Sequence, residues 1–92
     1  EEFKEEISIK AYSNPVLKEW NANHFNDIHM HDFDLFLYIQ KGELIIGVEH
    51  KYGLTTTTPT TCEYMEVLAG SKHYESVGKE GVVFLVAQRG NK

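Results

Sequence analysis

Three histidines carry the clearest chemical signal in this chain. His29 and His31 are separated by one residue, and His73 follows a polar stretch that contains Gly70. On a β-strand, residues i and i+2 point to the same face, so His29 and His31 would present two imidazoles side by side. Imidazole nitrogens are good ligands for divalent transition metals, and a third would complete a set with open positions for water or substrate. The spacing therefore predicts a metal site, provided that a turn at Gly70 returns His73 to the same place.

The segment around the first two histidines resembles the first sequence motif of the cupin family, over about residues 25 to 48. That motif reads histidine, any residue, histidine, three or four residues, glutamate, six residues, glycine. His29, His31 and Gly42 fit this pattern. The glutamate position, however, is occupied by Leu35, so one expected metal ligand is missing.

The segment around the third histidine resembles the second cupin motif, over about residues 62 to 80. That motif reads proline, any residue, glycine, two residues, histidine. Gly70 and His73 fit it, whereas Leu68 replaces the proline. The whole resemblance covers about residues 25 to 88, which is most of the chain.

The resemblance implies an all-β fold, the double-stranded β-helix or jelly-roll barrel, formed by residues 1–92 as one domain. It also implies a divalent metal on His29, His31 and His73, for which iron, nickel, manganese and zinc are all suitable. Relatives with three histidines include thiol dioxygenases and a diketone-cleaving dioxygenase. We therefore expect a metal-dependent dioxygenase or isomerase acting on a small polar or anionic molecule. The alternative is a non-catalytic ligand-binding or regulatory module, with or without metal, because one barrel hosts many activities.

Two carboxylates could replace the missing glutamate. Asp34 is adjacent to its position but on the opposite face of a regular strand, so it would need a bulge to reach the metal. Glu75 lies two residues after His73 and would share its inward face. A carboxylate in an apolar barrel costs roughly several kcal/mol unless it is paired, so Glu75 is a candidate ligand or catalytic acid or base. A twist that turns Glu75 to solvent is the alternative.

Hydrophobic alternation on its own also predicts an all-β barrel or sandwich, with no helix longer than a turn. An apolar stripe from 35, 37 and 39 is expected to pack against one from 44, 46 and 48. Turns are expected at Lys41-Gly42 and at 78–81, and a frayed tail at 88–92. The predicted strands cover 7–12, 16–20, a strand carrying His29 and His31, 35–40, 43–49, 55–58, a strand from 64 that ends at 69–70, a strand following His73, and 82–87. In small cupins the amino-terminal strand often pairs with a second subunit, so the resemblance implies a homodimer formed through 7–12.

Composition limits the partners. A net charge of −5 with 9 basic residues argues against a nucleic-acid surface. No apolar run approaches the roughly 20 residues of a membrane-spanning helix. Cys62 is the single cysteine and cannot form an internal disulfide, which favours a cytoplasmic protein. We expect His24 and His50 to be solvated and Met30 to have a packing role.

Overall fold

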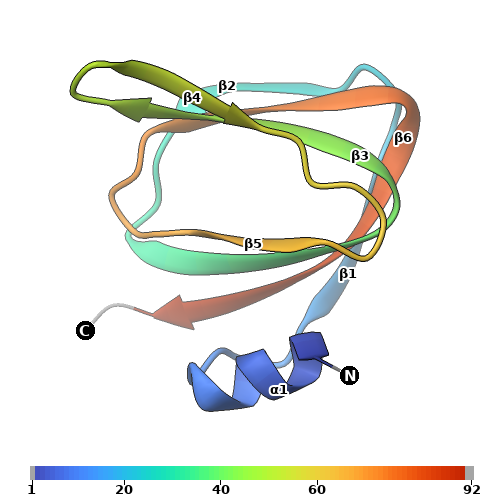
Figure 1. The fold of residues 1–92 in the computed structure, drawn as a ribbon, viewed down its shortest axis with the longest axis vertical. Coiled ribbons are helices and arrows are strands. Elements are labelled where there is room, and N and C mark those ends of the chain that lie inside the picture. Colours follow the sequence, from blue (N-terminus) through green and yellow to red (C-terminus); the bar gives the residue numbers. More distant parts are fainter. Residues whose placement is uncertain (1, 91–92) are drawn as a thin grey trace.

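The computed structural model describes residues 2–90, and all but one of its elements are β-strands (Figure 1). The predicted all-β class is therefore confirmed. Within the described residues, no helix is long and apolar enough to cross a membrane. The elements are α1 (Glu2–Ile9), β1 (Val16–Trp20), β2 (Phe25–His29), β3 (Phe33–His50), β4 (Gly53–Thr57), β5 (Tyr64–Val67) and β6 (His73–Gly90).

Two strands of 18 residues each, β3 and β6, run antiparallel along almost their whole length. Each strand bends midway, so that its two halves belong to two different sheets. One sheet has the order β1, β6, β3, β5, and the other has the order β2, β6, β3, β4. The sheets face each other and close the barrel that Figure 1 shows end on. This is the expected jelly-roll arrangement.

At both bends the sequence predicts a turn that reverses the chain, and this prediction was wrong. The chain does not reverse at Gly42 or Gly81, because β3 and β6 continue through these residues. Instead, the pairing register shifts on both sides of Gly42, and the two glycines have φ angles of 79° and 78°. A bulge of this kind bends a strand sharply and lets its ladder continue. The two strands also approach closely here, since a Cβ on Gly42 would lie 2.0 Å from the carbonyl oxygen of Gly81.

The predicted inward stripe is confirmed and forms the centre of the barrel. Its residues on β3 are at most 8% exposed, except for Val48, which is partly buried against the same cluster. They pack against inward side chains of β5 and β6. Burial of this apolar surface is the main stabilising term of the fold. The buried members are Leu35, Leu37, Ile39, Leu44, Ile46, Val67, Val77, Val82 and Phe84.

The amino-terminal segment is a helix, so the predicted strand over 7–12 was wrong. The alternation of Ile7 and Ile9 suggests a strand, but Ile9 is 77% exposed. Phe3 and Ile7, four residues apart, form the buried face of α1 and pack with Phe36 on the outer side of a sheet. The strand that was predicted to pair with a second subunit therefore does not form at residues 7–12.

The end of the chain is also more ordered than the sequence predicts. Residues 88–90 belong to β6 and pair with 33–35 of β3, so the prediction of a frayed tail was wrong for them. Residues 91 and 92 lie outside the described residues.

A charged network fastens this end of β6. The Arg89 side chain donates to Asp34 Oδ2 from Nε at 2.9 Å and from Nη2 at 2.6 Å, and its Nη1 donates to the Lys10 carbonyl oxygen at 2.7 Å. The Ala69 N–H donates to Asp34 Oδ1 at 2.7 Å. The Ala69 N–H and then the Arg89 guanidinium hold the pKa of Asp34 below its usual range.

Replacing Gly42 tests the bend. In Gly42→Ala, the left-handed backbone and the contact with Gly81 should together lower the free energy of unfolding by about 2 kcal/mol or more. Gly90→Ala is the control, because a Cβ there meets no atom within 4 Å. Urea denaturation measures both variants. A Gly42→Ala midpoint equal to that of Gly90→Ala would contradict the bend as described.

Replacing Asp34 tests the charged network. Asp34→Asn keeps the acceptor for Ala69 but loses the charge that faces Arg89, so the Tm at pH 7 should fall by a few degrees. Because the pKa of Asp34 is lowered in the folded state, its contribution is present above the ordinary value of about 3.9 and is lost as pH falls through the lowered value. The Tm difference from wild type should therefore disappear in strong acid. A difference that does not change with pH would contradict this assignment.

Candidate metal centre

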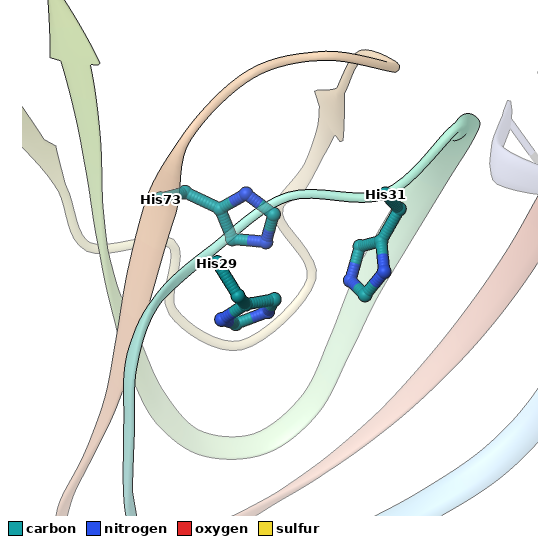
Figure 2. Close-up of side chains that lie close together, drawn as sticks. All are labelled: His29, His31 and His73. Carbon is teal, nitrogen blue, oxygen red and sulfur yellow. The ribbon is translucent and has the colours of Figure 1, made fainter.

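The structure brings the three predicted histidines together at one end of the barrel (Figure 2). One ring nitrogen from each of His29, His31 and His73 can be chosen so that all three atoms lie within 4.8 Å of one another. The ring centroids are 4.4 Å apart for His29 and His73, 4.9 Å for His29 and His31, and 5.5 Å for His31 and His73. The predicted convergence of the two histidine segments is therefore observed.

Backbone pairing holds two of the histidines, and a turn holds the third. His29, the last residue of β2, pairs directly with His73, the first residue of β6. His31 follows β2, so the prediction that it shares a strand with His29 was wrong. Its carbonyl oxygen accepts a 2.9 Å hydrogen bond from the Gly70 N–H. Gly70 has a φ of 81° inside a turn closed by a 3.1 Å bond from the Ser71 N–H to the Leu68 carbonyl. The turn before His73 thus also fixes the segment that carries His31.

The hydrogen bonds of His29 and His73 show which nitrogen of each ring has a free lone pair. Nδ1 of His29 lies 2.7 Å from the Asp27 carbonyl oxygen, and Nδ1 of His73 lies 2.9 Å from the Ser71 carbonyl oxygen. A carbonyl oxygen only accepts, so Nδ1 donates in both rings and Nε2 of each neutral ring keeps its lone pair. Nε2 of His73 is buried and has no hydrogen-bond partner among the described residues. Such a nitrogen is suited to bind a metal.

The surroundings of the third ring favour its neutral form. Burial, followed by the nearby His29 and His73, lowers the pKa of His31. A neutral imidazole can bind a metal ion, whereas an imidazolium cannot. The His31 ring also stacks on Phe33, with centroids 4.7 Å apart and planes 18° apart.

Glu75 points into the barrel beside the histidines and is 6% exposed, so the alternative of a solvent-facing side chain was wrong. Asn26, its partner across the β2–β6 pair, donates from Nδ2 to Oε1 at 2.9 Å. Oε1 lies 3.8 Å from Nε2 of His29, and Oε2 lies 3.7 Å from Nε2 of His73. Both separations are too long for hydrogen bonds.

The other candidate carboxylate is directed elsewhere. Asp34 is bound by Arg89 and by the Ala69 N–H, so it replaces no ligand at the histidines. Leu35, at the glutamate position of the motif, is 8% exposed and packs in the barrel core. Of these two carboxylates, the one beside the three rings is therefore Glu75.

A shallow groove of about 580 Å³ opens beside His31. Met30 lines it and is 58% exposed, so the predicted packing role of Met30 was wrong. His24 and His50 are exposed, as predicted. No sequence pattern indicates a role for Asn26, because that role depends on its register opposite Glu75. The groove is lined by Met30, His31, Asp32, Phe33, Ala69 and Gly70.

No family model and no curated protein matches this chain. Solved structures do match. Oxalate decarboxylase of Bacillus subtilis has a TM-score of 0.74 and 16% identity, over 83% of this chain and 20% of that chain. The Lactobacillus farciminis oxalate decarboxylase formate complex has a TM-score of 0.73 and 14% identity, over 83% and 23%. Drosophila melanogaster CENP-C bound to CAL1 has a TM-score of 0.72 and 10% identity, over 79% and 59%.

At these identities the likeness concerns the fold. The chain spans about a fifth of the length of the decarboxylases that it matches. The matched part includes most of the residues that form the two facing sheets. The likeness and the observed strand order together show that this chain has the fold of a cupin barrel.

Proposed function

We propose that this cupin domain binds a divalent transition-metal ion through His29, His31 and His73. The observation that carries this proposal is the buried Nε2 of His73, which has a lone pair but no hydrogen-bond donor among the described residues. An unsatisfied buried acceptor costs about 1–3 kcal/mol. A metal ion at this nitrogen would remove that cost and would bind the free lone pair of His29 as well.

The three rings fit such an ion after a small adjustment. Metal–nitrogen bonds are about 2.0–2.1 Å long, so two ligand atoms on one ion are at most about 4.2 Å apart. The three nitrogens lie within 4.8 Å of one another, so a pair at that separation must approach by at least about 0.6 Å, and by about 1.4 Å for a tetrahedral ion. His31 lies outside the strand ladder, so we expect its side chain to make this adjustment. Iron, nickel, manganese and zinc all remain candidates, and one of the similar structures describes Mn(II) centres in Bacillus subtilis oxalate decarboxylase.

The molecule bound next to the ion is proposed to be small and anionic or polar. Neutral imidazoles do not cancel the charge of a divalent ion, so the centre would attract anions. The groove beside His31 gives such a molecule access from solvent. When bound, the ion would supply Lewis-acid chemistry there. Phe33 and Met30 would exclude water from one side of the groove, and a dioxygenase or isomerase reaction suits this arrangement.

The second candidate is a non-catalytic binding or regulatory module. It is supported by the shallowness of the groove, which would leave a bound molecule exposed, and by the CENP-C match, whose title describes a complex with another protein. Oxygen uptake by the metal-loaded protein with thiols and diketones, and carbon dioxide release from oxalate, separate the two. Turnover supports the enzyme. Saturable anion binding without turnover supports the module.

His73→Ala tests the metal centre directly. Wild type should retain close to one ion per chain by elemental analysis, and at a free metal concentration 100 times Kd it should gain about 2.7 kcal/mol in free energy of unfolding. His73→Ala should lose most of the bound metal and most of this gain in free energy of unfolding. His50→Ala, an exposed histidine outside the cluster, is the control and should behave as wild type. Equal metal occupancy in His73→Ala would remove His73 from the centre.

A further inference from the structure

We infer that Glu75 is the fourth ligand of this centre, so that β6 supplies both a histidine and a carboxylate. This inference rests on the proposed metal site. It adds a negatively charged ligand to that site and places the ligand on β6. It differs from the motif pattern, in which the carboxylate would come from position 35 on β3. Of the two roles that the sequence leaves open for Glu75, it selects the ligand over the general acid or base.

The argument starts from the hydrogen-bonding groups that face one another. Nε2 of His29 and Nε2 of His73 each have a lone pair, because Nδ1 donates to a carbonyl in both rings. The two oxygens of an ionised Glu75 also only accept. They lie 3.8 Å and 3.7 Å from these nitrogens. Each of these two oxygens thus faces a nitrogen that also only accepts, and the facing acceptors repel each other unless a cation or a hydrogen-bond donor lies between them.

The distances suit a shared ion better than direct pairing. Two ligands on opposite sides of one ion are about 4.2 Å apart and two ligands of a tetrahedral ion are about 3.4 Å apart, so both oxygen–nitrogen separations lie between these values. A charge-assisted hydrogen bond between the same groups would be roughly 1 Å shorter than the observed separations. A shift of the Glu75 side chain by roughly a few tenths of an ångström would therefore bring the carboxylate to an ion bound by His29 and His73.

Asn26 fixes the orientation of this carboxylate. Its Nδ2 donates to Glu75 Oε1 across the β2–β6 pair, which uses one lone pair of that oxygen. A carboxylate oxygen has a second lone pair, and Oε2 receives no hydrogen bond from the described residues. Asn26 is thus a positioning residue, and Glu75 can bind the ion while keeping this hydrogen bond.

The test compares Co²⁺ binding in wild type, Glu75→Gln, Glu75→Asp and Glu49→Gln. Glu75→Gln keeps the side-chain shape and the acceptor for Asn26 but binds metals poorly. Glu49→Gln makes the same change at an exposed residue that lies outside the groove and beside Lys72, and so it is the control for long-range attraction. The readouts are Kd, by competition with a chromophoric chelator, and the visible absorption spectrum of bound Co²⁺.

If Glu75 is a ligand, Glu75→Gln should weaken Co²⁺ binding at least about tenfold and change the Co²⁺ spectrum. Glu49→Gln should leave the spectrum unchanged and alter Kd much less. Glu75→Asp, which keeps the charge but withdraws the oxygens by one methylene, should also weaken binding. Without metal, Glu75→Gln should melt above wild type, since its new N–H group can donate to Nε2 of His73.

Wild-type Kd and spectrum in Glu75→Gln, with Co²⁺ bound, would overturn the ligand role and leave the three-histidine site intact. Wild-type affinity in Glu75→Asp would overturn it as well, even if Glu75→Gln failed to fold. Failure of the wild-type protein itself to bind Co²⁺ would instead overturn the proposed function, so the two failures are distinguishable.

Discussion

The unbroken pairing of β3 with β6 is the constraint on which the rest of the structure depends. It places His73, at the start of β6, beside the end of β3 and leaves its other side free to pair with His29 on β2. The bends at Gly42 and Gly81 then turn the two halves of this ribbon face to face, so that one apolar core fills the space between them. The histidine cluster lies where this ribbon ends, and its geometry therefore follows from the same pairing.

Much of the barrel could be predicted because its strands alternate in hydrophobicity over several residues. The helix could not, because Ile7 and Ile9 alternate locally while the residue that α1 covers, Phe36, is far away in sequence. The two bends were wrongly predicted as turns, because the local sequence does not distinguish a turn from a bulge. A glycine with positive φ suits a reversal as well as a bulge, and only the partner strand decides between them.

The candidate site was predictable in its histidines and less so in its carboxylates. The spacing of His73 and Glu75 predicts a common face, but a strand twist could have turned Glu75 outward. The structure settles its direction through Asn26, whose register depends on an irregularity in the β2–β6 pair that the sequence does not reveal. Asp34 is held by Arg89, 55 residues away along the chain, and no local pattern indicates that pair.

The fold and the chemistry of the site are separate parts of this account, because cupin barrels of similar shape carry unrelated functions. The chemistry proposed for this chain depends on a set of acceptor atoms that face one another beside the histidines. X-ray absorption at the zinc edge of Zn²⁺-loaded protein tests that feature most directly. The account predicts a first shell with three imidazoles and a carboxylate oxygen. A shell with fewer than three imidazoles, or a protein that takes up no zinc, would contradict it.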